Sequence, residues 1–171
     1  MENQEQANKR IPILLDTPAS KRFVSIEPIL SKINLDMLIK PDTGDRFREV
    51  TSSLMGVKTL WDCGNLLAEE KINQLNWVIV GGESGHNARI TNPEWVLSLK
   101  QQCEDSKVPF FFKQWGEFIE ESQMTDKPSQ MKGKTYSLMN DGSTTFFRCG
   151  RKLAGKLLDG NVYHEFPSIK D

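Results

Sequence analysis

The sequence predicts an α/β protein with parallel strands, followed by a C-terminal hairpin and a helix. Three apolar runs carry this prediction: FVSI at residues 23–26, WVIV at 77–80 and VPFFF at 108–112. The last two runs are apolar without alternation, which is typical of strands covered on both faces in a parallel sheet. A helical pattern lies between them, so strand, helix and strand form a βαβ unit.

The N-terminal residues predict a short helix and then the first strand. Asn3 and Gln6 have the spacing of a capping box, and we expect the helix to end near Arg10 because Pro12 opposes its continuation. The strand at residues 23–26 is rich in β-forming residues. It ends at Glu27, before a proline that removes a backbone donor.

Residues 40–72 predict an irregular insertion with one or two short elements. The breakers PDTGDR, SSLMG and CGN interrupt scattered apolar residues there, and no period is sustained.

The second strand, at residues 77–80, is expected to end at Gly81 and Gly82. A helix should follow from Asn92, since a proline occupies the first-turn position that tolerates it, and should stop near Ser106. The third strand then begins at once.

The C-terminal part is expected to start with a polar surface loop at residues 120–134. Strands at 136–139 and 144–147 flank an Asn-Asp-Gly turn and predict a hairpin. A short helix should lie within 151–160, and residues 161–167 should dock as a strand or loop. The whole chain, residues 1–171, is interpreted as one domain.

Composition narrows the class of function. The net charge of −1 among 171 residues gives no basic field, so nucleic acid is not indicated as a partner. No apolar run approaches the roughly 18 residues that span a bilayer, and the first ten residues lack an apolar export signal. Cys63, Cys103 and Cys149 match neither a disulfide framework nor a metal site. We therefore expect a cytoplasmic protein with reduced thiols and no metal ligands.

Polar residues follow all three strands and form the candidate site. Glu27 follows the first strand, Glu83 and Ser84 the second, and Lys113 and Gln114 the third. The carboxyl ends of parallel strands share one rim, where ligands bind, so these side chains are expected to converge on a small molecule. The alternative is that each strand simply acquires a polar residue where it leaves the core.

The GGESG run adds further candidates. Gly81 and Gly82 allow a backbone to approach a ligand closely, and nearby amides can cradle an anion; the alternative is a tight turn. Arg89 can hold a carboxylate or phosphate in a bidentate fork, or be a surface arginine. A serine-hydrolase elbow at Ser84 is disfavoured, because His86 replaces the second glycine of that motif.

Three stretches carry a resemblance to a known family. They read ENQEQANKRIPILLDTPASKRFVSIEPIL, WVIVGGESGHNARITNPEWVLSLKQQCEDSKVPFFFKQWGEF and GRKLAGKLLDGNVYHEFP. Together they resemble the phage-type proteins of unknown function related to radical S-adenosylmethionine (SAM) enzymes. The resemblance implies a partial, radical-SAM-like (β/α) barrel of parallel strands. It covers the C-terminal half only, since by the resemblance the sequence begins where a family member would already be midway through its barrel. A complete barrel needs about 250 residues, so this chain is expected to hold only part of one.

The resemblance also implies a cofactor in the complete barrel. Full-length members look like barrels that open with a cysteine cluster, which would hold a [4Fe–4S] cluster and SAM. This chain lacks that cluster, so no cofactor is expected in it alone. By the resemblance, the strand-end residues line the cofactor or substrate rim. Acidic groups there would bind an amino group, and Arg89 or Lys113 a carboxylate.

Three functional hypotheses follow. The chain is the C-terminal part of an enzyme that needs an upstream barrel half and is not catalytic alone, or a non-catalytic binding or interaction module, or an enzyme that works without a cluster. Half a barrel leaves open sheet edges and an uncovered apolar interior, so an upstream half or self-association is expected to cover them.

Overall fold

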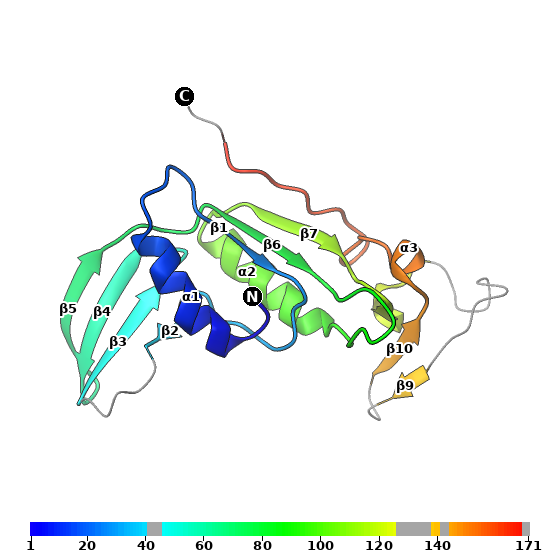
Figure 1. The fold of residues 1–171 in the computed structure, drawn as a ribbon, viewed down its shortest axis with the longest axis horizontal. Coiled ribbons are helices and arrows are strands. Elements are labelled where there is room, and N and C mark those ends of the chain that lie inside the picture. Colours follow the sequence, from blue (N-terminus) through cyan, green and yellow to red (C-terminus); the bar gives the residue numbers. More distant parts are fainter. Residues whose placement is uncertain (41–45, 126–137, 141–143, 169–171) are drawn as a thin grey trace.

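A three-stranded parallel sheet lies at the centre of the molecule, between two antiparallel sheets (Figure 1). The computed structural model describes residues 1–40, 46–125, 138–140 and 144–168. The elements in chain order are α1 (Gln4–Asp16), β1 (Phe23–Ile26), β2 (Leu38–Ile39), β3 (Phe47–Ser52), β4 (Val57–Asp62), β5 (Asn65–Lys71), β6 (Trp77–Gly81), α2 (Pro93–Asp105), β7 (Phe110–Gln114), β8 (Phe118–Glu120), the short 3₁₀ helix η1 (Glu121–Gln123), β9 (Leu138–Asn140), β10 (Thr145–Arg148) and α3 (Arg151–Ala154).

The parallel sheet has the order β1-β6-β7, and the predicted βαβ unit is confirmed. Helix α2 connects β6 to β7 and begins as expected, with Asn92 Oδ1 accepting the Glu94 amide at 2.8 Å. One face of the sheet is almost wholly buried and packs in the same core as α1 and α2. Its residues are Val24, Ile26, Val78, Val80, Phe110 and Phe112.

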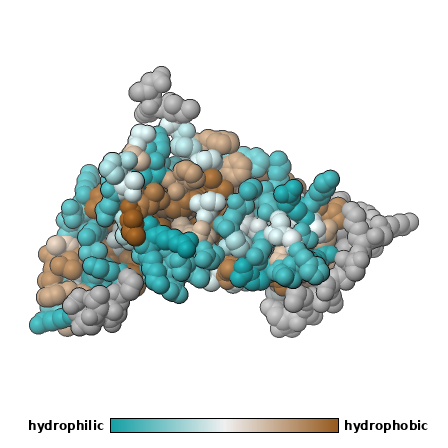
Figure 2. All heavy atoms as spheres, in the orientation of Figure 1, coloured by the Kyte–Doolittle hydropathy of each residue, from teal (hydrophilic) through white to brown (hydrophobic). Residues whose placement is uncertain are grey.

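The other face of the parallel sheet is open, aromatic at its amino end and polar at its carboxyl end. Phe23, Trp77 and Phe111 lie at its amino end, and Phe23 is 54% exposed. In Figure 2, hydrophobic atoms gather over this part of the sheet. Ser25 and Lys113 lie on the same face toward the carboxyl end and are both exposed.

Helix α1 extends further than predicted. It runs through Pro12 to Asp16, so the expectation that it ends near Arg10 is wrong. Ile11 and Leu15 are buried one turn apart on its inner face. Burying two aliphatic side chains contributes about 1.5–3 kcal/mol each, which outweighs the roughly 3 kcal/mol that an interior proline costs.

The stretch at residues 40–72, predicted to be irregular, instead contributes most of a regular antiparallel sheet of order β2-β3-β4-β5. A two-residue turn, Cys63 and Gly64, joins β4 to β5, and both residues have positive φ. This is the backbone of a tight hairpin, and the CGN breaker marks it. The strands gave no clear pattern because β5 is exposed along its whole length and β4 is half-buried throughout.

The C-terminal sheet has the order β8-β10-β9, and the predicted hairpin is confirmed where β9 pairs with β10. Residues 136, 137 and 141–143 of that prediction lie outside the described residues, as do residues 126–134 of the predicted surface loop. The described start of that loop forms η1, whose Gln123 is buried. Helix α3 is shorter than expected because Gly155 ends it with a φ of 70°.

Residues 161–167, the C-terminal strap, run antiparallel along the outer edge of β7. The Phe112 amide donates to the Tyr163 carbonyl at 2.8 Å, and the Glu165 amide donates to the Phe110 carbonyl at 3.2 Å. The strap also covers part of the open face, where His164 stacks on Phe111 at 4.4 Å between ring centroids. The predicted docking of this segment is confirmed.

The fold is therefore mixed α/β, and the described strands do not close into a barrel. The three predicted parallel strands are present and pair with one another in a single sheet. The strap occupies the edge of β7 where a further parallel strand would add. Within the described residues no helix has the length and apolar character needed to cross a membrane.

Candidate functional site

The parallel register brings the three predicted strand ends together. Ile26 pairs with Val80, and Val80 pairs with Phe112, so the chain leaves all three strands at one edge of the sheet. This carboxyl edge holds all eight residues of the predicted site or the loops that carry them. They are Glu27, Gly81, Gly82, Glu83, Ser84, Arg89, Lys113 and Gln114.

An ion pair joins the two outer strands across this edge. Lys113 Nζ lies 3.1 Å from Glu27 Oε2, and Ser25 Oγ lies 3.4 Å from the same oxygen. The pair passes over Gly81, where an added Cβ would lie 2.5 Å from Glu27 Oε1. Gly81 therefore makes room for the Glu27 carboxylate.

The two loops that follow β6 and β7 interlock through their glycines. A Cβ on Gly82 would clash with the Trp115 carbonyl, and a Cβ on Gly116 would clash with the Glu83 backbone. Gly116 also has a φ of +90°, which disfavours other residues. The Gly82 amide donates to the Gln114 carbonyl at 2.8 Å, and Gln114 Nε2 donates to the Gly82 carbonyl at 2.9 Å. The tight-turn alternative thus explains Gly82.

Arg89 binds Glu83 inside the loop. Its Nε and Nη2 donate to the two carboxylate oxygens at 2.8 and 2.9 Å, and its backbone amide donates to Oε2 at 2.8 Å. These hydrogen bonds to Arg89 hold the pKa of the Glu83 carboxyl below its usual range. Arg89 therefore forms a bidentate fork with the Glu83 carboxylate of its own loop, and its predicted role of holding a ligand carboxylate or phosphate stays a prediction.

Two further charged side chains, Glu117 and Arg148, bind backbone groups of the loop that follows β6. Glu117 Oε1 accepts the Gly85 amide at 3.1 Å, and Arg148 donates to the Gly85 and His86 carbonyls at 3.2 and 2.6 Å. The backbone amides of the GGESG run were predicted to bind an anion. One of them, the Gly85 amide, already binds the Glu117 carboxylate of the same chain. Ser84 Oγ lies 3.5 Å from Gln114 Nε2, at the limit of a hydrogen bond.

Two buried oxygens beside Gly82 have no hydrogen-bond partner among the described residues, namely Thr91 Oγ1 and Gln114 Oε1. Thr91 is only 2% exposed. Buried polar atoms are nearly always paired, so this corner of the edge has capacity for a further polar group.

Sequence reasoning missed Ser25, Thr91 and Glu117. Ser25 was recognisable, because it lies two residues before Glu27 and strand side chains alternate between faces. No sequence pattern indicated Thr91 or Glu117, because it is the packing of loops distant in sequence that brings them to the edge.

The cysteines do not fit an iron–sulfur cluster. Cys103 is buried in the core on α2, and burial raises the pKa of its thiol to about 12, whereas Cys63 is exposed in the β4–β5 turn. Within the part of the chain that the structure describes, no three histidine, cysteine or acidic side chains form a group that could hold a metal.

Comparison with known proteins gives one match. The model of a family described as "Protein of unknown function (DUF5131)" matches residues 1–167. No curated protein and no solved structure matches the chain.

Proposed function

Since the chain belongs to the DUF5131 family of proteins of unknown function, we propose its function from the resemblance carried by its sequence together with the geometry of its parallel sheet. It is the C-terminal part of a phage-type, radical-SAM-like barrel enzyme, which contributes part of the ligand rim and is not catalytic alone. The observation that carries the proposal is the division of the parallel sheet, whose helix-covered face is buried and whose open face ends in Ser25, Glu27 and Lys113.

The change of character along the open face supports its assignment as part of a barrel interior. In (β/α) barrels the helices cover the outside, and the other side of each strand faces the centre, with the chemistry at the carboxyl end. In this chain the open face is aromatic at its amino end, where Trp77 contacts Phe23 and Phe111 at 5.7 and 6.0 Å between ring centroids. It becomes polar at its carboxyl end.

The Glu27–Lys113 ion pair is suited to binding a zwitterionic ligand. A ligand with both an ammonium and a carboxylate group, such as the amino-acid moiety of SAM, can place its ammonium on Glu27 and its carboxylate on Lys113. Every charge then remains paired. The unpartnered Thr91 and Gln114 oxygens offer further hydrogen bonds nearby.

The strap defines where a completing polypeptide would pair. It occupies the outer edge of β7, so a further strand would add at β1. The N-terminal amino group donates to the Ser25 carbonyl at 2.8 Å at that strand and would have to move. Because the cysteines of this chain do not fit a [4Fe–4S] cluster, the cluster ligands would come from the completing polypeptide, and no catalytic step is assigned to this chain.

SAM binding tests the ligand assignment. Calorimetry would compare the chain alone with the chain co-purified with the product of the reading frame upstream of its gene. Glu27→Gln and Lys113→Met should each weaken binding by roughly tenfold or more, since each removes one charge-assisted bond. Glu70→Gln and Lys71→Met on exposed β5 are matched controls. Binding that is equal in all four variants would remove the edge from the site.

Association tests the barrel assignment. Anaerobic iron–sulfur reconstitution should give no cluster absorbance with the chain alone and a stoichiometric cluster with its completing polypeptide. Phe23→Ser, at the open face, should weaken the complex, whereas Ile13→Ser, 70% exposed on α1, should not. A stoichiometric cluster on the chain alone would contradict the proposal.

A second candidate is a non-catalytic interaction module. The observation that favours it is the exposed aromatic surface, where Phe166 is 64% exposed and lies 5.3 Å from Trp77 between ring centroids. Complex formation through this surface without any SAM binding would select this candidate.

A further inference from the structure

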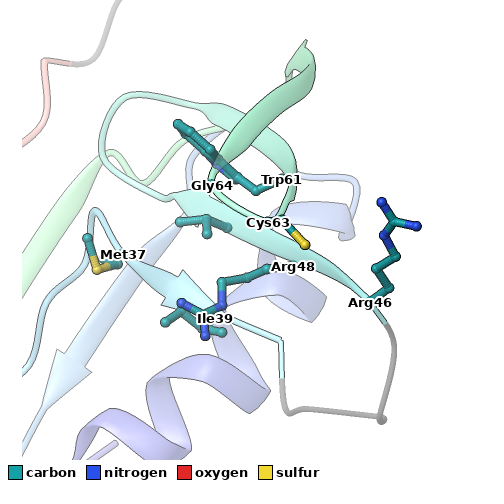
Figure 3. Close-up of a pocket in the computed structure, with 8 residues that line it drawn as sticks. Met37, Ile39, Arg46, Arg48, Trp61, Cys63 and Gly64 are labelled. Carbon is teal, nitrogen blue, oxygen red and sulfur yellow. The ribbon is translucent and has the colours of Figure 1, made fainter.

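A pocket of about 550 Å³ lies on the antiparallel sheet, apart from the carboxyl edge (Figure 3). Its volume is in the range of small-molecule sites. It is lined by Met37, Ile39, Arg46, Arg48, Val50, Trp61, Cys63 and Gly64. The lining is mainly apolar with two cations.

The two arginines of the pocket differ in their partners. Arg46 binds Asp62 through two hydrogen bonds of 2.7 and 2.8 Å. The Arg48 side chain has no ion-pair or hydrogen-bond partner among the residues that the structure describes. In Figure 3, Arg46 points away from the side on which Arg48 and Trp61 lie. Arg48 is therefore the cation available to a ligand.

The strand register places apolar groups around Arg48. Arg48 is opposite Trp61 in the β3–β4 pair, and Ile39 is opposite Val50 in the β2–β3 pair. The indole Nε1 of Trp61 donates to Thr59 Oγ1 at 2.9 Å, which orients the ring and uses its one donor. The ring thus offers a ligand apolar contact.

We propose that this pocket binds a small aromatic anion, a carboxylate or a phosphate. The anion pairs with the Arg48 guanidinium, whose planar fork matches both groups. The aromatic part packs against Trp61, Ile39 and Val50, where burial of apolar area adds affinity. This site is independent of the function proposed for the parallel sheet.

Amide chemical-shift mapping by NMR tests the proposal with three probes that share a naphthalene ring: α-naphthyl phosphate, the anion of α-naphthylacetic acid, and neutral α-naphthol. We expect the anions to shift amides of β2, β3 and β4 and to bind about tenfold tighter than α-naphthol. Arg48→Gln should reduce the anions to the affinity of α-naphthol. Arg151→Gln, which removes the same charge from exposed α3, should change nothing.

Two further measurements separate binding from misfolding. Trp61→Leu should weaken all three probes, with amide dispersion showing that the variant is folded. An anionic probe should slow alkylation of Cys63 by iodoacetamide in the native protein, and should do so less at the same concentration in Arg48→Gln. The proposal is overturned if α-naphthol binds as tightly as the anions, if Arg48→Gln has no effect, if no probe binds, or if the shifts fall on β6 and β7.

Discussion

The central parallel sheet and the antiparallel sheet β2-β3-β4-β5 are stabilised in different ways. The parallel sheet buries one face in the main core, with Ile26, Val80 and Phe112 all at 0% exposure, and its loops are locked by glycine contacts. In the antiparallel sheet β4 is half-buried throughout and β5 is exposed, so most of its order comes from strand pairing. Deep burial therefore holds the candidate site in place on the parallel sheet, whereas the exposed surface of the antiparallel sheet leaves room for a pocket.

Gly82→Ala should have the largest effect, because the added Cβ meets the Trp115 carbonyl, which is backbone and cannot rotate away. We expect a loss of about 3 kcal/mol or more in the free energy of unfolding, measured in urea. Gly64→Ala in the antiparallel sheet is the control. Its φ is +88° but open space surrounds it, so about 1 kcal/mol is expected. Equal losses would mean that the loops do not interlock.

Leucine truncation compares the core beneath the parallel sheet with the exposed edge of the antiparallel sheet. Leu99→Ala, on α2 beneath the parallel sheet, should cost about 2–5 kcal/mol because Leu99 is at 0% exposure. Leu66→Ala on β5 removes a side chain that is 49% exposed and should cost about 0.5 kcal/mol. If both truncations cost the same in urea denaturation, the contrast in burial does not govern stability.

Thiol reactivity measures the same contrast in the native protein. Cys63 is exposed in the β4–β5 turn and should react with iodoacetamide about a hundredfold faster than Cys103 at neutral pH. Burial keeps the Cys103 thiol protonated, with a pKa raised to about 12. Mass spectrometry of timed samples would give both rates, and urea should remove the difference. Rapid labelling of native Cys103 would show that α2 opens readily.

The smallest expected effect concerns the loop after β6. The Glu83 carboxyl should titrate below its ordinary pKa of 4.5 because Arg89 binds it. The pKa is lower in the folded state, so this contribution to stability is present above the ordinary pKa and lost as the pH falls through the lowered one. Arg89→Met should return the pKa toward 4.5 in a carboxyl-carbon NMR titration. Lys58→Met on β4 should leave it unchanged.

The sequence predicted the parts of the fold that depend on deep burial. The runs at residues 77–80 and 108–112 are apolar because their strands lie in the core, and the Asn92-Pro93 start of α2 is a local signal. The strands of residues 47–71 were missed because a half-exposed sheet tolerates polar residues on both faces. Their one local signal, the Cys63-Gly64 turn, was treated as a breaker.

The sequence predicted which edge of the sheet carries the candidate residues, but it did not predict which of those residues contact one another. Strand direction alone implies that Glu27 and Lys113 share an edge, and the structure joins them at 3.1 Å. No sequence pattern shows that Gly82 packs on Trp115, or that Thr91 is buried without a partner, because these contacts depend on how two distant loops meet.

The C-terminal strap decides at which edge the parallel sheet can accept a further strand. Because the strap already pairs with the outer edge of β7, a further strand could add to this sheet only at β1, where the N-terminal amino group would first have to leave the Ser25 carbonyl. Through this sheet one copy can pair with a single further strand, so two copies could join only edge to edge through their β1 strands. Repeated strand addition through the parallel sheet is thereby blocked by the seven residues of the strap, and their removal would open the edge of β7.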